Sequence, residues 1–377
     1  MKILIDARMY GPRGSKGLGR YIKEIIDGLV RQDSQNEYVI LLQRENWDDF
    51  AEKPGFHKVL APWRWYTLAE QIYLPRLIKK EKPDLVHFPH FNVPLFYFFS
   101  PFVVTIHDLL LRQYPSRRAS TLGPIKYWLK NIGYRLIVWA AVWRAKKIIT
   151  ISDFTKTEIL KYYPLVDRNK IEVVYEGVSK LEKEMIEKKD DNDVLLRYNI
   201  TDPFILYVGS AYPHKNLDKL ILAFARPEKN WTGKLVLVGK KDYFYQRLEE
   251  GVQELNTKSV LFLGYIPDSD LAVLYRQARV YVFPSLYEGF GLPPLEAMSW
   301  GLPVVASDIP SLREVIGDAY EKFNPKSVSD ILQKIKNVLT DNVKQEKLRY
   351  LGLEQIKKYN WDATVKKHID IYHAAKK

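Results

Sequence analysis

Residues 285–308 read SLYEGFGLPPLEAMSWGLPVVASD, a glycine-rich turn that leads from a strand-like run into a helix-like one. Gly289 and Gly291 permit backbone conformations that expose successive N–H groups. Pro293 and Pro294 suit the first turn of a helix, where the N–H that a proline lacks has no intrahelical partner. The partial positive charge of this helix N-terminus faces the turn, which predicts an anion site suited to a phosphate.

Two glutamates, Glu288 and Glu296, lie on either side of this turn. The helix N-terminus stabilises an anion by about 0.3–1 kcal/mol, whereas a bound diphosphate would repel both carboxylates. Each glutamate therefore needs a neutral donor: a ribose diol suits Glu296, and hydroxyls of a sugar attached to the phosphate suit Glu288. A nucleotide-sugar supplies both. On spacing alone the alternative is equally good, namely that Glu296 only complements the helix dipole and Glu288 is a solvated loop residue.

The rest of the sequence has the pattern of two α/β domains. Short β-branched runs alternate with helix-like stretches, which is typical of parallel sheets covered by helices. Such sheets bind ligands beyond the carboxyl ends of their strands. Strands are expected at 2–8, 37–43, 84–89, 102–108, 146–152, 170–177, 204–210, 235–239, 260–266, 280–285 and 303–307. Helices in the first half are expected at about 18–32, 66–80, 121–144 and 154–163, and a linker at 179–194.

Composition excludes several kinds of chemistry. The 377 residues include no cysteine, which removes disulfides, thiolate nucleophiles and cysteine-ligated zinc. The net charge of +13 is concentrated in residues 1–180, which hold 29 Lys and Arg against 18 Asp and Glu, whereas the remainder holds 29 against 27. No apolar run reaches the roughly 20 residues of a membrane span, and the short N-terminal run is interrupted by Asp6, unlike a signal peptide. A cytoplasmic location is expected.

The string EGFGLPPLEA, with WGLPVVASDIPSLREVIGDA at 300–319, resembles the signature of a large family of retaining glycosyltransferases that includes bacterial mannosyltransferases and glycogen synthases. The resemblance implies the GT-B fold, in which two Rossmann-like doubly wound parallel-sheet domains face each other across a cleft. Residues 359–375, YNWDATVKKHIDIYHAA, resemble the last helix of the family, which returns to the N-terminal domain. An acceptor-binding domain is thus expected at 1–178 plus 359–377, and a donor-binding domain at 190–358.

The same resemblance implies roles for the residues of the turn. Glu288 would contact the donor sugar and Glu296 the ribose. The backbone of Phe290, Gly291 and Leu292 would contact the sugar and the diphosphate. We therefore expect Glu288 among the catalytic residues and the other four among those that bind the donor.

A second stretch, LYVGSAYPHKNLDKLILAF at 206–224, resembles the first strand, loop and helix of the family's donor domain. Lys215 matches a lysine that grips the diphosphate, where a cation steadies the departing group. Asn216 is expected to cap the following helix. Many family members have an arginine where this chain has Ser210, so only half of the usual cationic pair is present. Without this context, Lys215 would be a solvated surface lysine. Ser210 and Tyr265 are also expected to bind the donor.

The stretch 5–26, IDARMYGPRGSKGLGRYIKEII, places Gly14, Gly17 and Gly19 between a strand and a helix. The spacing is not GxGxxG, so the dinucleotide fingerprint is weak. By resemblance this is the family's N-terminal glycine loop, which reaches the donor phosphate, and Gly17 and Gly19 are expected to bind the donor. Arg13, Lys16 and Arg20 would add positive charge. A plain strand-to-helix turn is the competing interpretation.

Histidines follow two strands of the first half. A lone histidine after a strand, such as His107 in VVTIHDLLL, is more often a packed or capping residue than a catalyst. By resemblance, however, His107 lines the donor-sugar pocket, and we expect it to bond a sugar hydroxyl and help orient the attack. His87, His90 and Asn92, in VHFPHFN, are expected to line the acceptor cleft.

No metal or other cofactor is expected. Asp268 and Asp270 form a DxD pattern, which in other transferases holds a divalent ion on a sugar diphosphate. Here it is better explained as a helix start with Asp268 or Ser269 as the N-cap. The family resemblance also implies catalysis without a metal ion, by helix dipoles and lysine.

Residues 109–147 contain nine Lys and Arg and no Asp or Glu. Within them LGPIKYWLKNIGYRLIVWAAVWRAKK predicts a helix that is apolar and aromatic on one side and basic on the other. Such a helix suits an anionic membrane surface, where each cation adds about 1 kcal/mol. A nucleic acid would use the same features, but none is expected as a partner. The alternative is a buried crossover helix with solvated basic residues.

We expect the chain to transfer a hexose from a GDP- or UDP-hexose to a hydroxyl of a glycan or lipid-linked acceptor, with retention of anomeric configuration. By resemblance the diphosphate leaves from the face that the acceptor attacks, and domain closure assembles the site. GDP-mannose is the first expectation for the donor, and a cell-envelope glycan for the product. Two alternatives stay open: a nucleotide-sugar epimerase, and a non-catalytic membrane- or nucleic-acid-binding protein on the same scaffold.

Overall fold

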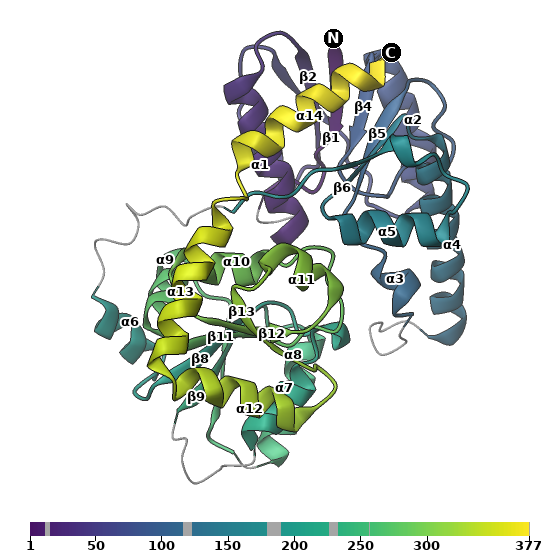
Figure 1. Cartoon of the computed structure of the whole chain (residues 1–377). Helices are drawn as coiled ribbons and strands as arrows, with labels where there is room; N and C mark the ends of the chain where they lie inside the picture. The colour runs from purple at the N-terminus through teal and green to yellow at the C-terminus, as the bar shows by residue number, and fades with distance from the viewer. Residues whose placement is uncertain (12–15, 116–122, 179–189, 226–232, 256, 377) are drawn as a thin grey trace. The chain divides into compact units, whose positions relative to one another are not determined.

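The computed structural model describes residues 1–11, 16–115, 123–178, 190–225, 233–255 and 257–376. They form two compact units (Figure 1). Unit 1 comprises Met1–Gly177 together with Asn360–Lys377, and unit 2 comprises Val178–Tyr359.

Unit 1 is built on a seven-stranded parallel sheet. Its strand order is β3-β2-β1-β4-β5-β6-β7. The strands are β1 (Lys2–Asp6), β2 (Glu37–Leu42), β3 (Phe56–Leu60), β4 (Leu85–Phe88), β5 (Phe102–Ile106), β6 (Lys147–Thr150) and β7 (Ile171–Val173). The chain starts in the middle of the sheet, at β1, and later crosses to β4 on its other side. All strands are parallel, and the order in which successive strands are added to the sheet changes direction between β1 and β4.

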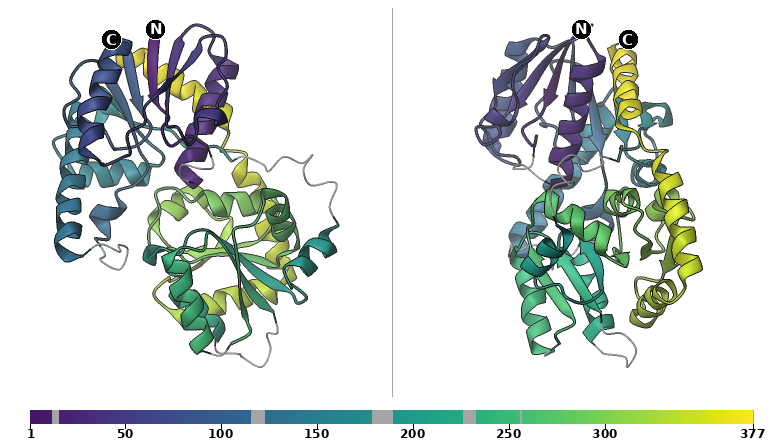
Figure 2. Two further views of the ribbon diagram at one scale, coloured as in Figure 1. Left: turned by 180° about the vertical axis from the view of Figure 1, so that it is seen from behind. Right: turned by 90° about the vertical axis from the view of Figure 1, so that its left-hand side faces the viewer.

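Helices cover both faces of this sheet. They are α1 (Lys16–Gln32), α2 (Leu68–Glu81), α3 (Leu110–Gln113), α4 (Pro124–Arg144), α5 (Asp153–Tyr162) and α14 (Trp361–Lys376), with 3-10 turns η1 (Trp47–Asp49) and η3 (Arg168–Lys170). Side chains of β1 alternate between two cores: Leu4 packs with α2, α4 and α5, whereas Ile3 and Ile5 pack with α1 and α14. Figure 2 shows α14, in yellow, beside the sheet of unit 1.

The C-terminal helix α14 docks closely on α1. A Cβ atom at Gly28 of α1 would lie 2.3 Å from Cγ2 of Val365 in α14. Glycine at this position lets the two helices approach, so a segment from the end of the chain completes the core of unit 1.

Unit 2 has a six-stranded parallel sheet in the order β10-β9-β8-β11-β12-β13. Its strands are β8 (Phe204–Val208), β9 (Lys234–Val238), β10 (Val260–Gly264), β11 (Val280–Phe283), β12 (Val304–Ser307) and β13 (Tyr320–Phe323). The helices are α6 (Asp191–Arg197), α7 (Leu217–Ala225), α8 (Tyr243–Glu254), α9 (Asp268–Gln277), α10 (Leu292–Ser299), α11 (Pro310–Ile316), α12 (Val328–Leu339) and α13 (Asn342–Ile356), with the turn η5 (Pro213–Lys215). In this sheet the strand order changes direction between β8 and β11, which pair in parallel.

These two doubly wound sheets confirm the predicted α/β class. The structure adds two strands that the sequence did not indicate, β3 and β13, each at an edge of its sheet. It also places α6 at 191–197, inside the C-terminal end of the segment expected to be a linker, whereas residues 179–189 lie outside the described part. Asp190 caps α6 by accepting from the N–H of Asn192, so the acidic residues there form a helix start.

Candidate functional site

Several of the predicted donor residues of unit 2 lie in the loops after β8 and β11, the neighbouring strands between which the strand order changes direction. The loop after β8 leads through Ser210 to Lys215, and the loop after the neighbouring strand β11 contains Glu288. Nζ of Lys215 lies 2.6 Å from Oε1 of Glu288, and these side chains are only 17% and 13% exposed. The reversal point of a doubly wound sheet is where such folds bind ligands. Lys215 and Glu288, which are 73 positions apart in the chain, thus form an ion pair at the carboxyl ends of these two strands.

Polar contacts fix these two loops to each other. The carbonyl of His214 accepts from the N–H of Leu286 at 2.7 Å. The side-chain amide of Asn216 donates to the carbonyls of Pro284 (3.0 Å) and Pro325 (2.8 Å). Asn216 was expected to cap α7; instead its backbone is left-handed (φ 60°) and its side chain joins loops. These hydrogen bonds connect the loops that carry Lys215 and Glu288.

Three tyrosines beneath the loop after β8 were not identified from the sequence. Their hydroxyl groups donate to successive backbone carbonyls: Tyr281 to Val208 (3.2 Å), Tyr245 to Gly209 (3.0 Å) and Tyr207 to Ser210 (2.8 Å). Burial raises the pKa of all three hydroxyls above the ordinary value, so they remain neutral donors. They hold the loop's carbonyls inward.

One of the two glycines of the turn, Gly291, has a backbone conformation that favours glycine. Gly291 immediately precedes α10 with φ 109° and ψ 53°, and a Cβ there would lie 2.6 Å from Cδ2 of Leu312. Glycine is therefore required at this position. The prolines lie in the first turn of α10, as predicted, and Leu292 is its first residue. The eight-residue helix α10 thus begins four residues after Glu288.

The remaining donor candidates of unit 2 differ in exposure. Phe290 is buried, and its ring packs edge-to-face on Tyr359 at 5.4 Å. Glu296 lies in the second turn of α10 and is partly exposed. Tyr265 is 70% exposed and follows β10, two strands away from β8 at the same edge of the sheet.

In unit 1, His107 follows β5 and contacts two acceptors. Its Nε2 lies 3.0 Å from the carbonyl oxygen of Pro89, and its Nδ1 lies 3.3 Å from Oε1 of Glu176. The ring of Tyr21 packs edge-to-face on the imidazole at 4.7 Å. Both nitrogens can donate only when the imidazole is protonated, and a sugar hydroxyl would have to displace one of these contacts. The sequence gave no reason to select Glu176 as a functional residue, although it contacts His107.

The prediction that His87 lines an acceptor cleft is wrong. His87 is fully buried, with Nδ1 2.8 Å from the hydroxyl of Tyr372 and Nε2 2.9 Å from Oγ1 of Thr105. Burial holds the pKa of His87 well below the ordinary value, so it stays neutral. Its role is to tie α14 to the sheet. His90 and Asn92, by contrast, line a small cavity together with Asp6.

The N-terminal glycine loop is only partly described. Gly19 lies in α1, where a Cβ would come within 2.2 Å of the carbonyl oxygen of Gly11. At Gly17 a Cβ would meet nothing within 4 Å. Arg13 and Gly14 lie outside the described residues, as does the side chain of Lys16. The close approach of the Gly11 carbonyl explains why position 19 requires a glycine.

The DxD pattern serves the structure of unit 2. The N-cap of α9 is Pro267 and Asp268 is its first residue, so the predicted cap at Asp268 or Ser269 lies too far along the chain. Asp270 is buried and accepts from Nη1 of Arg197 (2.9 Å) and the hydroxyl of Tyr198 (2.8 Å). Across the described ranges, no group of three or more His, Asp or Glu is arranged to hold a metal ion. Asp270 is committed to α6, which argues against a donor-site role.

The helix α4 exposes an apolar stripe. The stripe consists of Ile125, Trp128, Leu129, Ile132, Leu136, Trp139 and Trp143. Spacings of three and four residues place them on one side of the helix, and the three tryptophans are 63%, 52% and 37% exposed. The opposite side, with Val138 and Ala141, packs on the sheet. Among the described helices, none is long and apolar enough to span a bilayer.

Comparison with known proteins adds independent findings. The model of the family described as glycosyl transferases group 1 matches residues 188–355, and that of glycosyltransferase family 4 matches residues 15–180. The chain is 31% identical to O-antigen chain mannosyltransferase B of Escherichia coli, over 94% of this chain and 95% of the relative.

Solved structures show the same architecture. Sucrose-phosphate synthase of Thermosynechococcus elongatus has a TM-score of 0.75 at 22% identity, covering 99% of this chain and 98% of the other. The Anabaena protein HepE, in complex with UDP-glucose, has a TM-score of 0.72 at 18% identity, and the match covers 100% of both chains. These structures share the GT-B fold that the sequence predicted.

Proposed function

The chain belongs to the glycosyl transferases group 1 family, and from that premise we propose that it transfers a hexose from a nucleotide diphosphate sugar to an acceptor hydroxyl, with retention of configuration and without a metal ion. The observation that supports this most is the 2.6 Å contact between Lys215 and Glu288 beside the N-terminus of α10. It places a cation and a carboxylate at the carboxyl ends of the neighbouring strands β8 and β11.

These groups match the parts of a nucleotide-sugar. Lys215 and the N-terminus of α10 would hold the diphosphate, since both favour negative charge. Glu288 would then exchange its lysine partner for hydroxyls of the sugar, and Glu296 would accept from the ribose. In a retaining displacement the diphosphate leaves from the face that the acceptor attacks, and its oxygen takes the acceptor's proton. Gly17, Gly19, Ser210 and Tyr265 are proposed as further donor contacts, and His107 as the residue that orients the sugar.

We propose GDP-mannose as the donor and a lipid-linked or cell-envelope glycan as the acceptor. The relative from Escherichia coli is named an O-antigen chain mannosyltransferase, and this chain matches nearly all of its length. The Anabaena structure contains UDP-glucose, so a UDP-hexose is the other donor to test.

Substitution of Glu288 by alanine tests the site. We expect Glu288→Ala to lower kcat/KM for transfer by about 100- to 1,000-fold, as for the loss of a group that stabilises the transition state. Glu250→Ala, which removes an exposed carboxylate of α8 in the same unit, is the matched control and keeps wild-type activity. Release of nucleoside diphosphate measures both. Equal rates for Glu288→Ala and wild type would refute the proposed role.

We also propose that the apolar stripe of α4 rests on an anionic membrane. Lys126, Lys130 and Arg135 flank the stripe, and residues 109–147 contain no acidic residue. Lysine is depleted at protein–protein interfaces, whereas tryptophan flanked by cations is typical of membrane surfaces.

A neighbouring loop extends this surface. Phe96 and Phe98 are 64% and 72% exposed. Arg144, the last residue of α4, stacks on Phe98 at 4.0 Å and donates to the carbonyl of Leu95 at 2.9 Å. Because Arg144 joins the loop to the helix, both would contact lipid together.

Vesicle binding tests this contact. We expect the wild type to co-sediment with vesicles containing anionic lipid, more weakly in high salt, and brominated lipid to quench its tryptophan fluorescence. The variant Trp128→Ser/Trp139→Ser/Trp143→Ser should bind at least tenfold more weakly. The exposed pair Val343→Ser/Tyr350→Ser, on α13, is the control for loss of apolar surface and should bind normally. Dimerisation through the stripe, with no vesicle binding, would overturn the proposal.

A further inference from the structure

The backbone of Gly209, the first residue after β8, is fixed on the side of the neighbouring strand β9. Its N–H donates to the carbonyl of Val238, the last residue of β9, at 2.9 Å. Its carbonyl accepts from the hydroxyl of Tyr245, in the helix α8 that follows β9, at 3.0 Å. Both polar groups of Gly209 are therefore bound to the segment formed by β9 and α8.

Glycine at position 239 makes the second of these bonds possible. Gly239 is the first residue after β9. A Cβ there would lie 2.1 Å from the carbonyl oxygen of Gly209 and 2.4 Å from the hydroxyl of Tyr245. A side chain at this position would therefore push the hydroxyl and the carbonyl apart. The bond depends on the close packing of the loops that follow β8 and β9.

The same contacts determine the direction of the next N–H group, that of Ser210. In the trans peptide that joins Gly209 to Ser210, the C=O and the N–H point to opposite sides. Because β8 lies between β9 and β11, the N–H of Ser210 faces the side of β11, whose following loop contains Glu288. Among the residues that the structure describes, none accepts a hydrogen bond from it. Doubly wound sheets bind ligands at this change of strand order.

Tyr245 is itself held in place. Oδ1 of Asp242, the N-cap of α8, accepts from the backbone N–H of Tyr245 at 3.1 Å. The tyrosine ring packs edge-to-face on Phe262 of β10 at 6.1 Å, and the residue is 1% exposed. Burial raises the pKa of the hydroxyl above its ordinary value, so Tyr245 remains a neutral donor.

A second tyrosine fixes the other peptide group of Ser210. The hydroxyl of Tyr207, a fully buried residue of β8, donates to the carbonyl of Ser210 at 2.8 Å. A Cβ at Gly209 would lie 2.7 Å from this hydroxyl, so here too a glycine allows the approach. The peptide groups before and after Ser210 are thus each held by one tyrosine.

We propose that Tyr245 and Tyr207 are positioning residues of the donor site: they fix both peptide groups of Ser210, so that its N–H donates to a diphosphate oxygen of the nucleotide-sugar. The tyrosines make no contact with the donor and act through the backbone. A donor group that is ordered before binding loses less freedom when the ligand arrives. This inference rests on the proposed transferase function and adds the residues that shape its donor loop.

Nucleotide binding measures this role without turnover. A ligand-observed NMR titration of the full chain compares GDP with guanosine, and UDP with uridine. We expect Tyr245→Phe, which removes only a hydroxyl, to raise the Kd for the nucleoside diphosphate by about three- to tenfold, the effect of one lost hydrogen bond. The Kd for the nucleoside should stay unchanged, because the nucleoside has no phosphate. The KM for the nucleotide-sugar should rise by the same factor as the Kd for the diphosphate.

Two further variants support the comparison. Tyr320→Phe removes a buried hydroxyl of β13 that has no partner within the described ranges, so it is the matched control and should bind like the wild type. Gly239→Ala should weaken binding of the diphosphate more than Tyr245→Phe does, because its Cβ would displace both the hydroxyl and the carbonyl of Gly209.

The outcomes separate this inference from the proposed function. Equal losses of affinity for the diphosphate and the nucleoside in Tyr245→Phe would show a general structural role and overturn the inference. An unchanged Kd for the diphosphate in both Tyr245→Phe and Tyr207→Phe, or no binding of either diphosphate to the wild type, would also overturn it. If diphosphate binding depends on Tyr245 but no sugar is transferred, the positioning role is supported and the transferase function fails. If sugar is transferred with an unchanged donor KM in both variants, the positioning role alone fails.

Discussion

At the scale of single residues, Gly291 determines the geometry of the donor loop. Its φ of 109° and the 2.6 Å that would separate a Cβ from Leu312 make alanine unfavourable there. We expect Gly291→Ala to lower the free energy of unfolding by about 1–3 kcal/mol and to weaken donor binding. Gly251→Ala, in α8 where a Cβ meets nothing within 4 Å, is the matched control and should stabilise by about 0.5–1 kcal/mol. Urea unfolding measures both; equal stability of Gly291→Ala and wild type would contradict the account.

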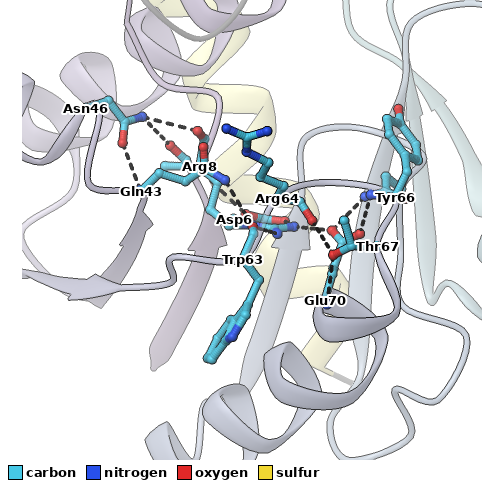
Figure 3. Close-up of polar contacts among 11 residues, drawn as sticks. Asp6, Arg8, Gln43, Asn46, Trp63, Arg64, Tyr66, Thr67 and Glu70 are labelled. Carbon is cyan, nitrogen blue, oxygen red and sulfur yellow. Dashed lines mark hydrogen bonds and ion pairs between the residues drawn. The ribbon is translucent and has the colours of Figure 1, made fainter.

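Arg8 gives a second residue-scale prediction. It is 1% exposed and is held by both oxygens of Asp6 at 2.7 Å and by Oε1 of Glu70 at 2.6 Å (Figure 3). Its replacement by methionine leaves Asp6 and Glu70 buried without a cation, and burial already raises the pKa of Glu70 against the opposing effect of Arg8. We expect Arg8→Met to destabilise by about 3–5 kcal/mol. The half-exposed pair of Arg313 with Asp308 offers the control, because Arg313→Met should cost less than about 1 kcal/mol. A similarly small effect of Arg8→Met would contradict this prediction.

At the scale of elements, α14 is held by a buried histidine network. His368 accepts from the hydroxyl of Tyr21 at 2.8 Å, and its Nδ1 donates to the carbonyl of Thr364 at 2.8 Å. Together with the contact between Tyr372 and His87, these bonds link the last helix to α1 and the sheet. Burial lowers the pKa of His368 to about 4, even though the bond to Thr364 opposes the shift.

This lowered pKa predicts acid sensitivity. The unfolded chain binds a proton at His368 below about pH 6.5, whereas the folded chain does so only near pH 4. Stability is therefore complete above pH 6.5 and falls as the pH drops toward 4, by up to roughly 3 kcal/mol from this group. His368→Gln should reduce the slope of unfolding free energy against pH, with His373→Gln, at an exposed position of α14, as the control. An identical slope in His368→Gln and wild type would exclude this cause.

The elements also show what the sequence could and could not predict. Buried central strands can be recognised in the sequence by their continuous apolar runs, such as ILYV in β8. The edge strands β3 (FHKVL) and β13 (YEKF) mix polar and apolar residues because part of each faces solvent, so no run marks them. The glycine–proline turn was predictable because its geometry is local.

Contacts between distant segments were not predictable. The sequence motif of His87 suggested a cleft residue. In the structure Tyr372 of α14, 285 positions later in the chain, contacts this histidine and helps to bury it. Glu176 and Glu70 lie in no recognisable motif, and only the folded chain brings them to His107 and Arg8. The loops that form the site followed from the pattern of strands, whereas the partners that position its side chains follow from packing.

At the scale of the whole molecule, the charge distribution matches the two roles proposed. Most of the excess positive charge lies in the first 180 residues, which include α4 and its apolar stripe. In the same unit, His90 and Asn92, which the sequence predicts to line the acceptor cleft, carry no charge, because burial lowers the pKa of His90 to about 3. We therefore expect high salt to weaken vesicle binding and to leave the KM for a water-soluble neutral acceptor nearly unchanged. An equal salt effect on both would contradict this separation.

The decisive experiment incubates the full chain with GDP-, UDP-, ADP- and dTDP-hexoses and a neutral acceptor, with and without EDTA, and follows products by NMR. We expect one sugar nucleotide, with GDP-mannose first, to release its nucleoside diphosphate and form a glycoside of unchanged anomeric configuration, at the same rate with EDTA. An inverted product, a turnover abolished by EDTA, or an isomerised nucleotide-sugar with no glycoside would contradict the proposal of a metal-independent retaining transferase.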